Sequence, residues 1–183
     1  MKLTDTGFEG LTVIGSQVFE DSRGYFYEGF NRDVLRNKGL DIEVVQTNIS
    51  ESQKNVVRGL HFQNPPFAQG KLIRALKGAV LDVVVDIRTD SPTYGRHFSI
   101  ELSETNKQAL WVPVGFAHGF RTLEDHTLFY YDCSQVYNRE SEGSILWNDP
   151  ELGIDWGIED PVLSEKDRVA LLFRQFESQF TIV

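Results

Sequence analysis

The amino-acid sequence predicts an all-β fold, an antiparallel β-sandwich or barrel with a few short peripheral helices. The clearest sign is the segment 78–88, GAVLDVVVDIR, in which apolar and polar residues alternate. The apolar residues fall on one face and Asp82, Asp86 and Arg88 on the other, which is typical of a half-buried strand. Other short apolar segments separated by turns, and the scarcity of helix signals, favour the same class.

Strands are expected in chain order over residues 11–19, 25–30, 43–50, 56–62, 70–77, 78–88, 96–102, 109–112, 117–123 and 126–136. The segments DSPTYG at 90–95 and WNDP at 147–150 are predicted turns.

Two helices are predicted. Residues 31–40 have Asn31 as N-cap and Gly39 just past the end. Residues 164–178 form the second predicted helix, capped by Ser164.

The chain of 183 residues fits one domain over residues 1–183 and carries a net charge of −9. This acidity argues against general nucleic-acid binding but not against an anionic small ligand held by a few arginines. Cys133 is the one cysteine, so neither an intrachain disulfide nor a cysteine metal cluster is expected. No segment resembles a signal peptide or a membrane span, and we expect a cytoplasmic protein.

The segment 58–71, RGLHFQNPPFAQGK, is the most informative part of the sequence. It combines a possible base, His61, with the cations Arg58 and Lys71, a mixture that suits proton abstraction next to a carbonyl. By itself, His61 is more often a hydrogen-bonded structural histidine, and Lys71 a solvated lysine at a strand end. Strict alternation places Arg58 opposite His61, although a bulge at Gly59 would bring both to one site.

The segment PVGFAHGF at 113–120, which contains His118, resembles the second motif of the cupin family. Many cupins bind a metal through His-x-His and a downstream Glu in their first motif. Here the matching place reads His61-Phe62-Gln63, so Gln63 stands where the second His is expected, and Lys71 stands about where the Glu is expected. A protonated lysine cannot bind a metal and repels a cation, so no metal site is expected, whereas the cupin-like fold is.

Further candidates lie outside these segments. Alternation sends Tyr130 and Tyr131 to opposite faces, so one of them can share a cavity with His61 and return a proton from the other side. Asp167, in the first turn of the predicted second helix, is either a capping carboxylate or a partner that orients His61. Each of the remaining candidates, taken singly, is explained as a residue on the solvated surface. Together with Arg58 they can bind a diphosphate and a flat base: Arg23, Phe26, Glu28, Gln46 and Asn48.

Taken together, the motifs resemble the dTDP-4-dehydrorhamnose 3,5-epimerase family over residues 11–170. They are FEDSRGYFYE, QTNIS, VVRGLHFQ, QGKL, DVVVDIR, SPTYG, WVPVGFAHGF, SEGSILWNDP and LSEKD, in the order of the family. The resemblance implies a cupin-like jelly-roll homodimer without metal or redox cofactor, in dTDP-L-rhamnose synthesis. The substrate it implies is dTDP-4-dehydro-6-deoxy-D-glucose.

The resemblance also implies roles. His61 would be the base, Asp167 its dyad partner, Tyr131 the opposing acid and Lys71 the cation at the enolate oxygen. The implied nucleotide-sugar site comprises Arg23, Phe26, Glu28, Gln46, Asn48, Arg58, His118, Glu142 and Lys166, with Arg23 and Phe26 acting across the dimer.

The segment from Tyr131 to Asn138 departs from the run of residues that is usual in the family. This departure leaves open an epimerase that acts at C3 alone or at C5 alone. Two further classes of protein compete with an epimerase: a non-catalytic nucleotide-sugar-binding cupin and a metal-dependent cupin enzyme. The absence of a Gly-rich dinucleotide fingerprint agrees with chemistry that needs no redox cofactor.

Overall fold

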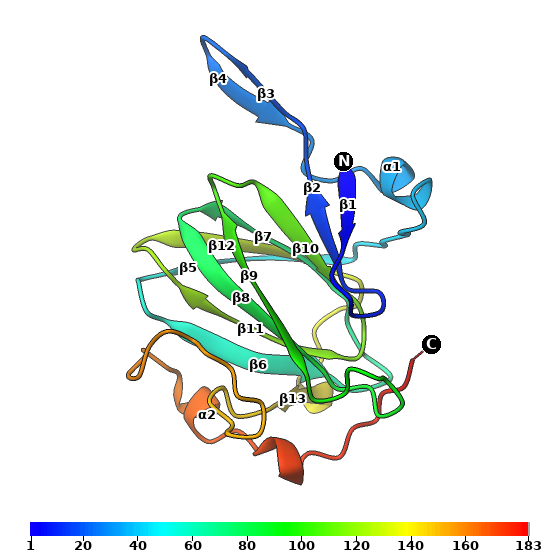
Figure 1. Cartoon of the computed structure of the whole chain (residues 1–183), viewed down its shortest axis with the longest axis vertical. Helices are drawn as coiled ribbons and strands as arrows, with labels where there is room; N and C mark the ends of the chain where they lie inside the picture. Colours follow the sequence, from blue (N-terminus) through cyan, green and yellow to red (C-terminus); the bar gives the residue numbers. More distant parts are fainter. Residues whose placement is uncertain (183) are drawn as a thin grey trace.

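Two antiparallel sheets face each other and enclose the main apolar core in this computed structural model, which describes residues 1–182 (Figure 1). The six-stranded sheet has the order β1-β2-β10-β7-β12-β5 and the five-stranded sheet the order β13-β6-β11-β8-β9. The prediction of an antiparallel, mostly β fold is confirmed.

The strands of the six-stranded sheet are β1 (Lys2–Asp5), β2 (Thr12–Gly15), β10 (Gln108–Val112), β7 (Lys71–Lys77), β12 (Thr127–Cys133) and β5 (Gln46–Ser52). Those of the five-stranded sheet are β13 (Glu142–Ser144), β6 (Val57–Gln63), β11 (Phe116–Thr122), β8 (Ala79–Asp86) and β9 (His97–Ser103). The predicted strand 11–19 is two strands, and β1 and β13 were not predicted because neither carries an alternating apolar pattern.

The prediction that β8 is half-buried, with one face toward solvent, is wrong. Asp82 and Asp86 are fully buried, and Arg88, just beyond the strand, is 5% exposed. The physical reason is that both faces of β8 are covered. Val80 and Val84 pack against the opposite sheet, and Val83 lies under a second cluster that includes aromatic residues of the C-terminal region. A polar residue on this strand therefore points into the protein rather than into water.

The helix expected over residues 31–40 is a short one, α1 (Arg32–Arg36), and its predicted N-cap is confirmed because Asn31 accepts a hydrogen bond from the Val34 N–H. The predicted helix over residues 164–178 is wrong. Only α2 (Glu165–Arg168) and a 3-10 turn, η2 (Phe173–Gln175), form there.

Tertiary hydrogen bonds explain this difference. The Leu171 carbonyl accepts from the Leu146 N–H at 2.7 Å, and the Phe173 N–H donates to the Asp149 carboxylate at 2.8 Å. Bonds of this kind hold the chain in an extended path across the five-stranded sheet, where aromatic residues such as Phe176 join the second apolar cluster. Tertiary contacts override helix propensity at this point.

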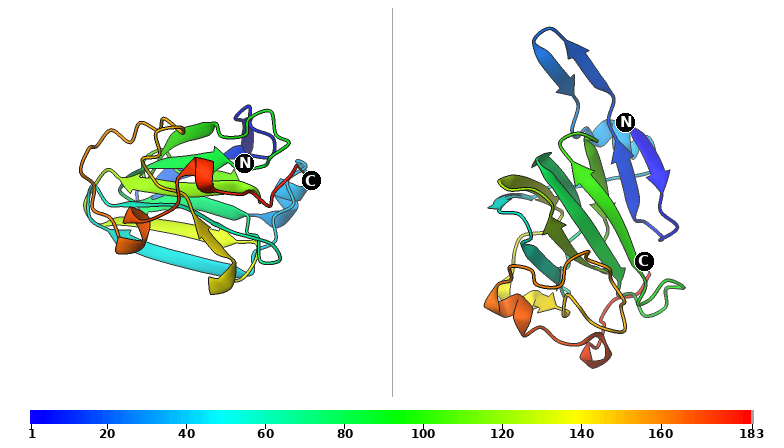
Figure 2. Two further views of the ribbon diagram at one scale, coloured as in Figure 1. Left: turned by 90° about the horizontal axis from the view of Figure 1, so that it is seen from below. Right: turned by 60° about the vertical axis from the view of Figure 1, so that its left-hand side comes forward.

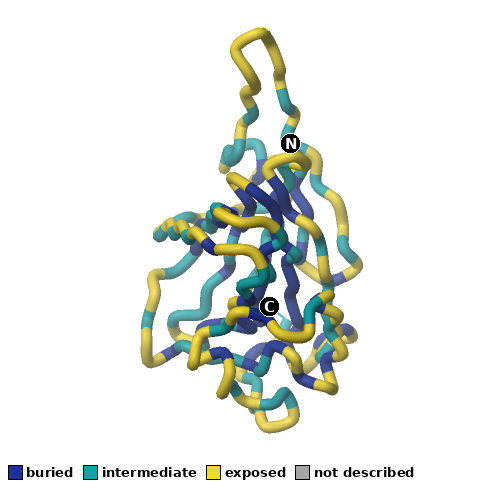
Figure 3. The backbone as a smooth tube through the Cα atoms, turned by 90° about the vertical axis from the view of Figure 1, so that its left-hand side faces the viewer, coloured by how far each residue is buried: buried dark blue, intermediate teal, exposed yellow. Residues whose placement is uncertain are grey.

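A two-stranded hairpin, β3 (Val18–Asp21) and β4 (Gly24–Tyr27), extends away from the sandwich (Figures 1 and 2). Figure 3 shows the residues at its tip as exposed, and the large hydrophobic residues Phe19, Tyr25 and Phe26 are 56%, 57% and 68% exposed. A two-stranded hairpin is only marginally stable alone. The other peripheral element is the 3-10 turn η1 (Arg139–Ser141). Across residues 1–182, no helix has the length and apolar character needed to cross a membrane.

Candidate active site

A β-bulge in β6 brings two of the predicted site residues to the same side. His61 pairs with His118 of β11, whereas Arg58 pairs with Phe120, so three steps along β6 match two steps along β11. Gly59 lies at the bulge with a positive φ, and a Cβ there would come within 2.5 Å of the Gly119 Cα. The backbones meet this closely only because both positions are glycine. Of the two arrangements that the sequence left open, strict alternation and a bulge at Gly59, the structure shows the bulge.

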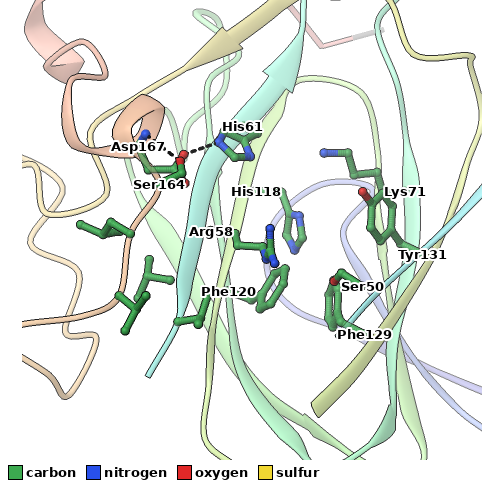
Figure 4. Close-up of a pocket in the computed structure, with 14 residues that line it drawn as sticks. Ser50, Arg58, His61, Lys71, His118, Phe120, Phe129, Tyr131, Ser164 and Asp167 are labelled. Carbon is green, nitrogen blue, oxygen red and sulfur yellow. Dashed lines mark hydrogen bonds and ion pairs between the residues drawn. The ribbon is translucent and has the colours of Figure 1, made fainter. Parts of the chain in front are cut away.

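The bulge opens onto a cavity of about 460 Å³ between the two sheets (Figure 4). Apolar side chains such as Phe120 and Phe129 form part of its wall. The charged and polar side chains that line it come from β5, β6, β7, β11, β12, and α2 with its N-cap: Ser50, Arg58, His61, Lys71, His118, Tyr131, Ser164 and Asp167. This mixture of apolar walls and a few convergent polar groups is typical of small-molecule sites.

His61 and Asp167 form a close pair. The Asp167 Oδ1 lies 2.6 Å from the His61 Nε2, and the Ser164 hydroxyl donates to the other carboxylate oxygen at 2.7 Å. Burial alone would raise the pKa of Asp167, but the hydrogen bonds from His61 and Ser164 outweigh it and hold the pKa below its usual value. A carboxylate at this place can orient the imidazole.

Lys71 and Tyr131 lie across the cavity from His61. In Figure 4, the Lys71 side chain extends toward the His61 ring, and the Tyr131 hydroxyl lies beside it. Burial lowers the pKa of Lys71 and raises the pKa of Tyr131, so the phenol keeps its proton at neutral pH. Tyr130 points to the opposite face of β12 and donates to Asp132 at 2.8 Å, which confirms that the two tyrosines lie on different faces.

His118 is buried deeper than His61 and has its own carboxylate. Its Nε2 lies 2.9 Å from the Asp82 Oδ2, and its ring stacks on Phe129 with centroids 6.0 Å apart. Burial raises the pKa of Asp82, while His118 and Lys71 act in the opposite direction. The sequence prediction missed Asp82 because period-two alternation alone cannot tell which face of a strand meets water.

A smaller recess of about 130 Å³ shares His61, Lys71 and Tyr131 with the main cavity. Its rim carries Tyr137 and Glu142, and the Tyr137 hydroxyl donates to the Glu142 carboxylate at 3.3 Å. The predicted site residues Gln46, Asn48 and Glu142 line this recess, and Lys166 forms an ion pair with Glu142.

Three predicted site residues lie elsewhere. Arg23 is in the turn of the β3–β4 hairpin and pairs with Asp21, and its side chain is 88% exposed. Phe26 is in β4, and Glu28 follows it and accepts a hydrogen bond from Asn31 at 3.0 Å. The single chain does not bring these residues into the cavity or the recess.

The position where a cupin metal ligand is expected holds Gln63, whose side chain binds the backbone instead. Its amide donates to the carbonyls of Phe67 and Val136 at 2.6 and 3.1 Å, and its carbonyl accepts from the Asn138 N–H. Within residues 1–182, no group of three or more His, Cys, Asp or Glu side chains is arranged to hold a metal ion.

The facing antiparallel sheets and the cavity between them define a cupin-like protein whose site is equipped for proton transfer. The chain belongs to the dTDP-4-dehydrorhamnose 3,5-epimerase family, whose sequence profile matches residues 5–175.

The individual relatives agree. The dTDP-4-dehydrorhamnose 3,5-epimerase of Salmonella typhimurium is 46% identical over 96% of this chain and 97% of its own. The crystal structure of the Elizabethkingia anophelis enzyme of that name superposes with a TM-score of 0.90 at 47% identity, covering 96% of this chain and 97% of its own. A dTDP-6-deoxy-D-glucose-3,5-epimerase from Legionella pneumophila, solved in complex with dTDP-4-keto-L-rhamnose, gives 0.91 at 43% identity, covering 96% and 94%.

Proposed function

We propose that this protein inverts C3 and C5 of dTDP-4-dehydro-6-deoxy-D-glucose to give dTDP-4-dehydro-L-rhamnose, a step of dTDP-L-rhamnose synthesis. The family supports this reaction. The observation that carries it is the placement of the His61–Asp167 pair, Lys71 and Tyr131 around one cavity. A base, an acid and a cation together are what an epimerisation next to a ketone requires.

The chemistry begins with the C4 ketone, which acidifies the protons on C3 and C5. His61 removes one of these protons, and Asp167 stabilises the imidazolium that forms. The electron pair of the C–H bond moves into the ring, and the negative charge develops on the C4 oxygen. The Lys71 ammonium stabilises that enolate, because a fixed cation in a low-dielectric cavity acts more strongly than one in water.

Inversion then requires a proton from the other face of the sugar. Tyr131 is the proposed acid because its phenol lines the same cavity and burial raises its pKa, so a proton is available at neutral pH. The enolate then collapses to the C4 ketone. Before the second inversion, the His61 imidazolium releases its proton to solvent and the Tyr131 phenolate takes one from solvent, and the same steps then occur at the second carbon. Each cycle leaves the redox state of the sugar unchanged.

The nucleotide part is proposed to bind through groups of the main cavity and of the recess beside it. Arg58 supplies a guanidinium that can bind a phosphate in a bidentate manner, and His118 supplies a second polar ring in the same cavity. The amides Gln46 and Asn48 and the charged pair Glu142 and Lys166 surround the smaller opening.

We further propose a homodimer in which the β3–β4 hairpin of one subunit completes the cavity of the other. Arg23 and Phe26 are exposed on this hairpin, where they line a surface hollow, and they reach neither the cavity nor the recess at His61 of their own subunit. An arginine and an exposed aromatic ring are suited to a diphosphate and a flat base. The hairpin would also bury its apolar side chains by crossing to a partner.

The experiment that tests the reaction is incubation with dTDP-4-dehydro-6-deoxy-D-glucose in D2O, followed by mass spectrometry and NMR. Deuterium at C3 and C5 together with inversion at both carbons is the expected result. Label and inversion at one carbon alone would show a single-centre epimerase. Binding without any label would favour a nucleotide-sugar-binding cupin and exclude the proposed base and acid.

A further inference from the structure

The least expected group in the protein is a carboxylate inside the sandwich. Asp82 stands between Val80 and Val84 on the face of β8 that meets the opposite sheet, and it has no solvent exposure. A buried carboxylate is strongly disfavoured unless it is paired. A side chain kept at such a position calls for an explanation in the neighbouring site.

The pairing of Asp82 is incomplete. Its Oδ2 lies 2.9 Å from the His118 Nε2, but its Oδ1 has no hydrogen-bond partner among residues 1–182. The ring of His118 is itself buried, between Phe129, on which it stacks, and the cavity that it lines. Asp82 is therefore the side chain that fixes the orientation of this ring, while one edge of the ring remains available to the cavity.

Two histidine–carboxylate pairs thus lie side by side. His118 and His61 are direct cross-strand partners on β11 and β6, and each has its Nε2 against a carboxylate from a different element. They differ in access, because the His61 side chain is 28% exposed and that of His118 is 8% exposed. The pair formed by His118 and Asp82 is accordingly the inner one.

We propose that Asp82 is a positioning residue of the epimerase site. It holds His118 through the Nε2 proton, and its negative charge balances the cations that face the cavity. Asp82 lines neither the cavity nor the recess, so it would act on the enolate through Lys71 and His118. This role rests on the proposed function.

The electrostatics of the cavity support this role. Burial lowers the pKa of Lys71, and Asp82 is among the groups that oppose the shift, so its charge helps to keep the lysine protonated. The other titratable and charged groups that line the cavity and recess or act on Lys71 are Arg58 and His61 of β6, Tyr131 and Cys133 of β12, Glu142 of β13, and Lys166 and Asp167 of α2. Among these groups, Glu142 is paired with Lys166, and Asp167 is paired with His61.

The test is Asp82→Asn, which removes the charge and keeps a hydrogen-bond acceptor for His118. We expect kcat to fall roughly 10- to 100-fold with little change in KM, as for partners that orient a functional histidine. The alkaline limb of the kcat/KM profile should move to lower pH by about one unit, because Lys71 loses a neighbouring anion and releases its proton more easily. Asp82→Leu, which also removes the acceptor, should lower kcat further.

The matched control is Asp132→Asn. Asp132 is also a buried aspartate, 5% exposed, but it lies on the outer face of β12 and accepts from Thr47 and Tyr130. A kcat and a pH profile of Asp82→Asn equal to those of this control would overturn the proposal.

A second measurement needs no variant and no substrate. In the wild-type protein, ¹⁵N NMR should show the His118 Nε2 carrying a proton throughout the neutral pH range. A neutral ring with its proton on Nδ1 would overturn the positioning role even if Asp82→Asn fails to fold. If the wild-type protein inverted neither carbon, the proposed function would be wrong, and the position of this proton would still decide whether Asp82 orients His118.

Discussion

Inside the cavity, neighbouring side chains of the same type have different environments. His61 and His118 are cross-strand partners, yet only His61 has substantial exposure, and its carboxylate comes from a helix rather than from the sheet. The two tyrosines of β12 differ in the same way, since Tyr131 lines the cavity and Tyr130 lies on the outer face. The contrast between the two tyrosines provides a matched control for the proposed acid.

Replacing the base should stop turnover without unfolding the protein. We expect His61→Ala to lower kcat roughly 10²- to 10⁴-fold, the range for loss of a general base. The control is His126→Asn, because His126 is an exposed histidine in a turn with a positive φ that asparagine tolerates. Steady-state kinetics and circular dichroism check both variants, and near-normal turnover of His61→Ala would contradict the assigned base.

Replacing the acid should separate proton removal from inversion. In Tyr131→Phe, His61 can still take a proton and return a deuteron to the same face, so we expect label in the substrate with little inversion. Tyr130→Phe loses one hydroxyl from the same strand but should retain full epimerase activity. NMR in D2O distinguishes the two outcomes. Unchanged inversion in Tyr131→Phe would transfer the acid role to Tyr137 or water.

At the scale of the element, two features of the chain decide the site. The bulge in β6 turns Arg58 and His61 toward one cavity, and the N-cap of the four-residue helix α2 places Asp167 against His61. The β3–β4 hairpin is different, because its exposed Arg23 and Phe26 contribute nothing to the cavity of their own subunit. Its function depends on the proposed partner.

Subunit mixing tests the crossing hairpin. Arg23→Ala and His61→Ala should each inactivate their own homodimers. If Arg23 of one subunit enters the cavity that contains His61 of the other, a mixed dimer has one cavity with both defects and one with neither. Random exchange should restore about a quarter of the wild-type activity, because half of the dimers are mixed and each has one intact site. Mass spectrometry verifies the exchange. No recovery in verified mixed dimers would show that the hairpin does not cross.

At the scale of the whole molecule, a buried ionic network ties the five-stranded sheet to the loop that follows β8. Asp86 accepts hydrogen bonds from Arg88, Ser91 and Thr93, and both charged side chains are almost completely buried. Burial would raise the pKa of Asp86, but these bonds outweigh it and hold the pKa below its usual value.

This network should make stability depend on acid pH. Because the folded-state pKa of Asp86 is lowered, its contribution is fully present above the unfolded-state value of about 3.9 and is lost as the pH falls through the folded-state value. We expect Asp86→Ala to lower the free energy of unfolding by about 3–5 kcal/mol at neutral pH, because Arg88 is left buried without its partner. The difference from wild type should shrink at acid pH.

Urea unfolding at several pH values measures this effect. The control is Asp33→Ala, which removes an exposed carboxylate from α1 and should change stability by about 0.5 kcal/mol or less. An equal loss in both variants would contradict the buried network.

Much of the architecture follows from local patterns. Alternation located the strands, and Asn31 and Ser164 located two helix starts, whereas the bulge at Gly59 was one of two alternatives that the sequence left open. The prediction of a long C-terminal helix was wrong. Hydrogen bonds to Leu146 and Asp149 hold that segment extended, and its aromatic residues pack in the second apolar cluster. Local propensity is weak compared with tertiary contacts of this kind.

The sequence by itself determined the antiparallel class, the motifs of the family and the set of residue types that a proton-transfer site needs. Only the tertiary structure decided which of them meet: the contact of His61 with Asp167, 106 positions apart, and the burial of Asp82 against His118. The physical reason is that alternation fixes the two faces of a strand but not what covers each face. That is decided when the sheets close on one another and exclude water.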